Sequence, residues 1–243
     1  MLTRCISAEC LKLRHSRMWL ILIVLPVISA FIGSANYYFN RGVLQNGWYS
    51  LWTQVSLFYG EFFLPVLIAI CCAYVCRLEH TNKNWNMVMT APVPAAYVFL
   101  AKLVVIGVFA LFVQSLFLFL FDVAGTAFKI DTPFPVEALG WIMRGWLAAM
   151  SIAVIQLWLS MRIHSFATPI GISLCCVFLG LGMYIAKLGF FFPHSLLTIG
   201  MGVLSQESLT SVETIQFFVM SIGYLVTVSA LAIRWLYKTD LAT

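Results

Sequence analysis

The sequence predicts an all-α membrane protein with six transmembrane helices and both termini in the cytoplasm. Of its 243 residues, 62% are hydrophobic and 9% are charged, whereas average soluble domains are roughly 45–50% apolar and about 25% charged. Six apolar runs approach or exceed the length of about 20 residues that a helix needs to cross a bilayer core. No repeat, low-complexity stretch or soluble domain separates these runs, so residues 1–243 are expected to form one membrane domain.

The first apolar run predicts a retained span and not a secretory signal. It begins at Met18 and continues to about Ala35, which is too long for the hydrophobic part of a signal peptide, and no small-residue cleavage site follows. Long segments are expected after the first span (36–56) and after the fifth (190–212). The expected spans are 18–35, 57–76, 97–121, 138–160, 168–189 and 213–233.

The distribution of lysine and arginine predicts the orientation, because cytoplasmic flanks of membrane spans carry an excess of these residues. If the N-terminus lies inside, ten basic residues flank the spans on the cytoplasmic side. Four lie on the outer side, namely Arg41, Lys129, Arg144 and Lys187. An even number of spans then returns the C-terminus to the cytoplasm.

The stretch 79–102, EHTNKNWNMVMTAPVPAAYVFLAK, is a polar interruption on the predicted cytoplasmic side between the second and third spans. Its apolar residues Trp85, Val88 and Met89 share one face of a short helix, with Asn82, Lys83 and Asn86 largely opposite. Pro92 ends this helix, because a proline disfavours helix at the preceding residue. Such a helix is either a passive interfacial anchor or a docking element for a soluble partner, and the pattern alone leaves both interpretations open.

Motifs of catalysis and nucleotide binding are absent from the sequence. HExxH, GxSxG and GxxxxGK[ST] do not occur, so neither an intramembrane enzyme nor an ATP site of the phosphate-loop type is expected. The seven cysteines and four histidines show no metal-ligand spacing. The cysteines are expected to be small buried side chains. No metal, cofactor or nucleic acid is expected as a ligand of this chain.

Polar and aromatic residues in or near the spans suggest a path for a transported molecule. Glu61 lies one turn inside the expected second span, on the order of 6 Å from its outer edge. It is expected to snorkel, to pair with Arg41 or Arg144, or to gate a cargo. Gln114 and Gln156 lie deeper and are expected either to join helices or to line the path. Trp48 and Trp52 are expected either in an interfacial belt or at an outer contact with a peptide.

The spacing Glu79–x5–Trp85–x6–Pro92, followed by Lys102 at the head of a span, resembles the coupling region of type-2 ABC exporter permeases. Within that family it is most similar to the lantibiotic (bacteriocin) immunity and bacitracin-type permeases, although Pro94-Ala95 departs from their usual serine–basic pair. The run Glu9-x2-Lys12-x-Arg14-x2-Arg17 before Trp19 is similar to the amphipathic elbow helix of these permeases.

The resemblance implies a permease subunit of an ATP-driven exporter in a bacterial plasma membrane. Its partners would be an ATP-binding subunit that holds ATP and Mg²⁺, and a second permease chain, identical or related. The cargo would be an amphipathic antimicrobial peptide; the alternatives are another cargo (a drug, lipid or haem-related molecule) or a scaffold or sensor that transports nothing. Residues of the coupling helix would be Glu79, Asn82, Lys83, Trp85, Val88, Met89 and Pro92. An exposed ion pair of Glu79 would contribute only about 0–1 kcal/mol.

Overall fold

The computed structural model describes residues 1–243 except 15, 82–92, 206–208 and 241–243, and every regular element in this described part is a helix. In chain order they are α1 (Leu2–Leu13), α2 (Met18–Phe39), α3 (Gly47–Ser56), the π-helix η1 (Leu57–Phe63), α4 (Leu64–His80), α6 (Ala95–Ala127), α7 (Glu137–Arg162), α8 (Ala167–Ile185), the 3₁₀ turn η3 (Gly189–Phe191), α9 (Pro193–Gly200) and α10 (Ser211–Asp240).

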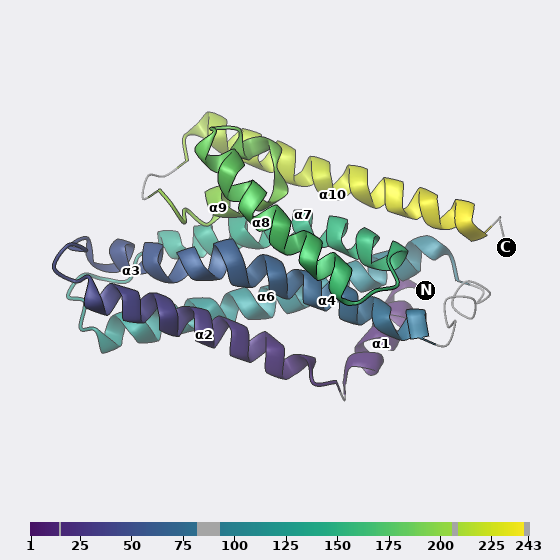
Figure 1. Cartoon of the computed structure of the whole chain (residues 1–243), viewed down its shortest axis with the longest axis horizontal. Coiled ribbons are helices and arrows are strands. Elements are labelled where there is room, and N and C mark those ends of the chain that lie inside the picture. Colours follow the sequence, from purple (N-terminus) through teal and green to yellow (C-terminus); the bar gives the residue numbers. More distant parts are fainter. Residues whose placement is uncertain (15, 82–92, 206–208, 241–243) are drawn as a thin grey trace.

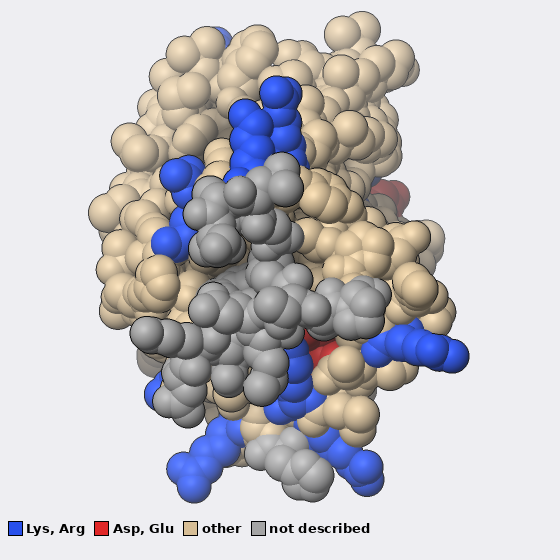
Figure 2. All heavy atoms as spheres, turned by 90° about the vertical axis from the view of Figure 1, so that its right-hand side faces the viewer, with Lys and Arg blue, Asp and Glu red and all other residues tan. Residues whose placement is uncertain are grey.

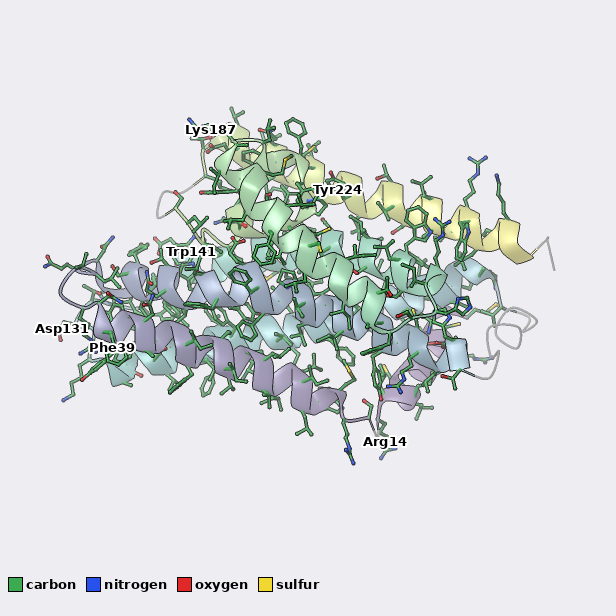
Figure 3. The ribbon with its side chains drawn as sticks, viewed as in Figure 1. Arg14, Phe39, Asp131, Trp141, Lys187 and Tyr224 are labelled. Atoms are coloured by element: carbon green, nitrogen blue, oxygen red, sulfur yellow. The ribbon has the colours of Figure 1, made fainter. Side chains whose placement is uncertain are left out.

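Six of these helical stretches are long and apolar enough to cross a membrane, which confirms the predicted number. All of them except α8, which crosses the others obliquely, run along the long axis of the molecule, and α1 and the C-terminal end of α10 lie at the same end (Figure 1). We call this end the terminal end and the opposite one the distal end. Arg14 lies at the terminal end, whereas Phe39 and Asp131 lie at the distal end (Figure 3). The six stretches are Met18–Phe39, Gly47–His80, Ala95–Ala127, Glu137–Arg162, Ala167–Ile185 and Ser211–Lys238.

The second span is much longer than predicted, because α3, η1 and α4 continue one another from Gly47 to His80. The predicted long segment 36–56 is therefore short: α2 extends to Phe39 and α3 begins at Gly47. The prediction left residues 47–56 outside the second span, because the tryptophans of this stretch suit a membrane interface as well as a helix core. In the structure Trp52 instead packs on Trp141 of α7, with ring centroids 4.7 Å apart.

The fifth span is shorter than predicted. Helix α8 ends at Ile185, and Lys187 adopts a positive φ of 60° that no continuing helix allows. The chain then turns through η3 into α9, which packs on both α7 and α8. The segment 190–212 is thus partly a short buried helix, with Leu196 and Leu197 fully buried.

Helix α7 lies at the centre of the bundle and is packed by α4, α6, α9 and α10 (Figure 1). The second span and α7 are the most buried of the six, whereas α8 and α10 are the least buried. Large apolar side chains of α8 and α10, such as Phe178 and Val219, are therefore exposed. The exposed cysteines Cys10 and Cys175 also correct the expectation that all seven are buried; all seven are free.

Two glycines allow helices or side chains to approach more closely than a Cβ atom would permit. At Gly33 of α2, an added Cβ would lie 2.4 Å from the Cα of Val55, so α2 meets α3 backbone to backbone. At Gly125 of α6, it would lie 2.1 Å from the indole ring of Trp48. The ring of Trp48 therefore occupies the space that the missing side chain of Gly125 leaves.

Gly125→Ala should lower the thermal stability of the purified protein, although alanine is the better helix former by about 1 kcal/mol. The added methyl group must displace the buried ring of Trp48, and overpacking costs typically about 1–3 kcal/mol. Thermal unfolding in detergent, followed by circular dichroism, measures the change. Gly171→Ala in α8 is the matched control, because nothing lies within 4 Å of its added Cβ. Equal stability of the two variants would contradict the packing of Trp48 on Gly125.

Candidate functional site

Four charged side chains from three helices meet at the terminal end of the bundle, and we call them the ionic cluster. Glu9 and Lys12 come from α1, Glu79 from the last turn of α4, and Lys102 from α6. The ammonium of Lys102 lies 3.0 Å from Glu9 Oε2 and 2.8 Å from Glu79 Oε1. The ammonium of Lys12 lies 2.7 Å from Glu9 Oε1 and 2.7 Å from Glu79 Oε1. All ion pairs found among the described residues belong to this cluster.

The cluster is buried and electrically balanced. Lys102 and Glu79 have side chains 0% and 2% exposed, and only Lys12 reaches water, at 33%. Lys102 donates its third hydrogen bond to the carbonyl of Val75 at 3.1 Å, so all three of its N–H groups have partners. Two ammonium groups balance two carboxylates, which is the condition under which buried charges are tolerated.

The pKa of Lys12 reflects the same balance. Burial by itself lowers this pKa, but the hydrogen bonds and charges of Glu79 and Glu9 raise it above the ordinary value of 10.5. Lys12 is therefore charged at neutral pH. Because its folded-state pKa is raised, its stabilising contribution is complete below the ordinary pKa and is lost only as the pH rises through the raised value.

The cluster fixes the positions of the helix ends on both sides of residues 82–92. Glu79 stands in the last turn of α4, before this segment, and Lys102 stands two turns inside α6, after it. His80 Nε2 also lies 2.7 Å from the carbonyl oxygen of Ser160, which joins the end of α4 to α7. The N-terminal helix α1, the end of α4 and the start of α6 are thus held as one unit.

The structure corrects the predicted exposure of Glu79, while its part in coupling stays a prediction. Its carboxylate is not the exposed start of a surface helix, because it belongs to α4 and bonds two lysines inside the protein. One oxygen, Oε2, has no hydrogen-bond partner in the described part of the chain. The sequence did not predict that Glu9 and Lys12 reach Glu79, since their three-residue spacing predicts only a pair on one helix face. The remaining predicted coupling residues, Asn82, Lys83, Trp85, Val88, Met89 and Pro92, lie outside the described residues.

The structure places Glu61 deeper than predicted. The helix starts at Gly47, so Glu61 lies fourteen residues in, on the order of 20 Å along the helix. Its side chain belongs to η1 and is 5% exposed. The expected snorkelling is therefore wrong. So is the pairing with arginine, since Arg144 donates to the carbonyl of Gly200 at 3.1 Å and no ion pair of Glu61 occurs in the described part of the chain.

Met201, just after α9, lies beside Gln114 and beside Gly60, the neighbour of Glu61 in the sequence. Gly60, next to Glu61, is so close to Met201 that an added Cβ would lie 3.4 Å from its sulfur. The amide of Gln114 lies 4.0 Å from the same sulfur. Oxygens Oε1 of Glu61 and Gln114 both lack a partner within the described residues. On α7, Gly145 lies against Met201, and Gln156 lies about three turns further along that helix. Gln156 is therefore not near Met201.

The indoles of Trp48 and Trp52 are internal. Trp48 is 4% exposed and its Nε1 donates to the carbonyl of Thr132 at 2.7 Å. Trp52 is 1% exposed and its Nε1 donates to the carbonyl of Met201 at 2.8 Å. In this conformation the two buried indoles join segments of the distal end, and Trp48 also lines a cavity at that end. An outer contact of either tryptophan with a peptide stays a prediction.

Lys102→Met should destabilise the protein by about 3 kcal/mol or more, because it leaves two buried carboxylates with one ammonium, and breaking a buried pair costs roughly 3–5 kcal/mol. Thermal unfolding in detergent measures the loss. The rate at which a protease cleaves α1 should rise in parallel, because α1 is held by the cluster.

Two comparisons complete this test of the cluster. Lys129→Met, at an exposed distal lysine, is the matched control and should leave the stability unchanged within about 0.5 kcal/mol. The double variant Glu79→Gln/Lys102→Met removes one charge of each sign and should recover part of the loss. If Lys102→Met unfolds at the same temperature as Lys129→Met, the cluster does not hold the helices.

Comparison with known proteins agrees with a multi-pass membrane fold. No curated protein matches the chain. Residues 5–180 match the family model described as ABC-2 family transporter protein. The matched region covers more than half of the chain and contains α1 from Cys5, the first four spans, most of α8 and the whole ionic cluster. The chain therefore belongs to the ABC-2 family of transporter proteins, as a multi-pass membrane permease.

Proposed function

We propose that the chain is the permease subunit of an ATP-driven exporter and that residues 82–92 dock it to an ATP-binding subunit. Family membership implies such a partner, and the sequence has no phosphate-loop motif of its own. In this proposal Trp85, Val88 and Met89 contact the ATP-binding subunit. Glu79 holds the base of the segment inside the membrane subunit.

The ionic cluster is the observation that carries the proposal. Its four charges connect α1 with the end of α4 and the start of α6. The last two precede and follow the docking segment in the sequence. A partner that displaces this segment would therefore move α1, α4 and α6 together, whereas without the cluster it would bend only the loop. Movement of the second and third spans as a unit is what a coupling device requires.

The surface charge of the terminal end favours the cytoplasmic side for this end. Viewed toward that face, several lysine and arginine side chains lie at the surface, and little acidic surface is visible (Figure 2). The exposed basic residues in or just after α1 and near the C-terminal ends of α4, α7 and α10 include Arg4, Arg14, Arg77, Arg162, Arg234 and Lys238. An excess of basic residues is typical of cytoplasmic flanks and is attracted to anionic lipid.

A second permease chain, identical or related, completes the proposed assembly. The exposed apolar faces of α8 and α10 offer surface both for the second permease chain and for lipid. The cargo we propose is an amphipathic antimicrobial peptide, expelled outward for self-protection of a bacterial cell. Support for this cargo comes from the resemblance of residues 79–102 to immunity permeases. Export of a drug, lipid or haem-related molecule and a non-transporting scaffold are the alternative outcomes of the tests below.

Trp85→Ala should weaken the association with the ATP-binding subunit by roughly 30-fold. A tryptophan at the centre of an interface contributes about 2 kcal/mol or more, and each 1.4 kcal/mol is a factor of ten. The measurement is co-purification of the ATP-binding subunit from detergent-solubilised native membranes at equal permease levels. Peptide resistance of cells carrying the variant is a second measurement, because loss of coupling must abolish export.

Trp19→Ala is the matched control for this experiment. Trp19 stands at the start of α2, at the same end of the molecule, and its side chain is 44% exposed. Its removal should leave recovery of the ATP-binding subunit unchanged. Unchanged recovery for Trp85→Ala as well would reject the docking role, and lost association without any change in peptide resistance would reject the peptide cargo.

The orientation can be tested with single cysteines in a cysteine-free background. Gly42→Cys, at an exposed distal position with no atom within 4 Å of its Cβ, should react in intact cells with a membrane-impermeant thiol reagent. Thr81→Cys, which is exposed at the end of α4, should react only after the cells are opened. The reverse pattern would place the proposed docking segment outside the cell and exclude coupling to a cytoplasmic subunit.

A further inference from the structure

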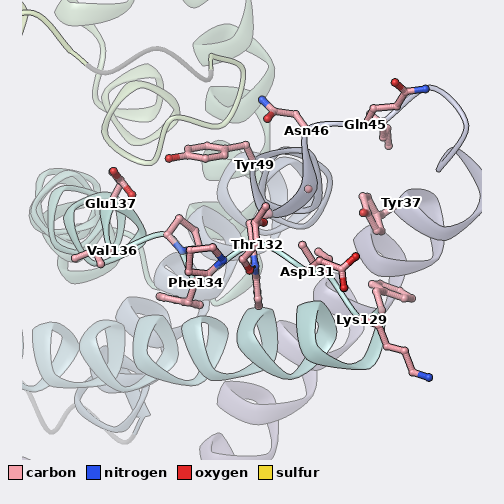
Figure 4. Close-up of a pocket in the computed structure, with 17 residues that line it drawn as sticks. Tyr37, Gln45, Asn46, Tyr49, Lys129, Asp131, Thr132, Phe134, Val136 and Glu137 are labelled. Atoms are coloured by element: carbon pink, nitrogen blue, oxygen red, sulfur yellow. The ribbon is translucent and has the colours of Figure 1, made fainter.

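A cavity of about 660 Å³ opens at the distal end, between the end of α2, the start of α3 and the connection from α6 to α7 (Figure 4). Its volume lies within the range of about 300–1,000 Å³ that is typical of small-molecule sites. It is far from the ionic cluster, which lies at the other end of the bundle.

The buried indole of Trp48 holds the walls of this cavity in place. The ring packs edge-on against Phe121 and Phe134, with ring centroids 5.2 and 5.4 Å apart. Its Nε1 donates a hydrogen bond to the carbonyl of Thr132. Gly47 has a positive φ of 49° and places its backbone against the side chain of Thr132. The α6–α7 connection is therefore fastened to α3, and the cavity is a built feature of the fold.

The lining combines aromatic rings with carboxylates. Tyr37, Tyr49 and Phe134 contribute rings, and Asp131 and Glu137 contribute acidic groups. Neither carboxylate belongs to an ion pair in the described part of the chain. Figure 4 shows Asp131 beside Thr132 and Tyr37, and Glu137 on the far side, beyond the hydroxyl end of Tyr49.

Two positively charged side chains also lie at or near the cavity. Lys129 also lines the cavity, but its side chain extends away from the other labelled side chains (Figure 4). Arg41 lies outside the lining, with its guanidinium 4.6 Å from the ring of Phe128 and 5.7 Å from that of Tyr37. These contacts are cation–π contacts, in which a cation lies over the negative face of an aromatic ring.

We propose that this cavity binds a lysine or arginine side chain of a peptide cargo at the distal end of the permease. The ring faces would hold the cation, and Asp131 and Glu137 would balance its charge. Gln45 also lines the cavity; its amide nitrogen donates to the carbonyl of Gly42 at 3.2 Å, and its amide oxygen would accept from a peptide N–H group. The peptide identity of the cargo rests on the proposed function, whereas the preference for a cation rests on the lining alone.

Binding can be measured with the purified permease in nanodiscs of zwitterionic lipid. The probe is a short fluorescent synthetic peptide containing several lysines, followed by anisotropy, and the same peptide with acetylated lysines is the uncharged comparison. Acetylation should weaken binding about tenfold or more. Asp131→Asn and Glu137→Gln should each weaken binding about threefold, as expected for one partly exposed ionic contact, and the double variant about tenfold.

Asp122→Asn is the matched control, because Asp122 is an exposed acid near the end of α6 that does not line the cavity. It should bind the lysine peptide like the wild type. Equal binding by the double variant and the wild type would overturn the proposal, as would equal binding of the two peptides. A loss in Asp122→Asn as large as in the cavity variants would show general surface attraction only and would also overturn it.

Unfolding temperatures of all variants must match the wild type, which excludes loss of fold as the cause. None of the binding outcomes depends on the ATP-binding subunit. Failure of this inference therefore leaves the Trp85→Ala result untouched, and failure of the proposed coupling leaves peptide binding in nanodiscs untouched.

Discussion

The requirement that no charge be left unpaired in an apolar interior organises the terminal end of this protein. Lys102 is fully buried, and its ammonium is satisfied only because Glu9, Glu79 and the carbonyl of Val75 converge on it. Glu9 comes from α1, whereas Val75 and Glu79 both come from α4. The helix α1, which could otherwise lie anywhere on a membrane surface, is thereby fastened to α4 and α6.

At the distal end, side-chain donors satisfy backbone carbonyl groups. The C-terminal end of α9 points its carbonyls into the bundle, where water cannot satisfy them. Trp52 donates to the carbonyl of Met201, and Arg144 donates to that of Gly200. Trp48 does the same for Thr132 in the α6–α7 connection. These side chains close the distal end and shape the cavity beside Trp48, so tryptophans that suit a lipid interface act here as internal hydrogen-bond donors.

Some residues selected for function were recognised by a short motif, whereas the position of others depends on which helices surround them. Lys102 and Glu79 were selected by a motif, and the structure joins them, although the motif said nothing of Glu9. Glu61 was expected near an outer edge, because the start of the second span was taken from hydropathy. The true start depends on whether Trp48 and Trp52 face lipid or other helices, and that is a property of the neighbours α6, α7 and α9.

The sequence by itself determined the number of spans, the all-α class and the resemblance to type-2 permeases. These follow from the length of apolar runs and from short motifs, which are local properties of the chain. The tertiary structure alone decided which polar and aromatic side chains are buried together. The ionic cluster, the caps of α9 and the distal cavity each join residues far apart in sequence, and the free energy of a buried polar group depends on partners that only the packed fold supplies.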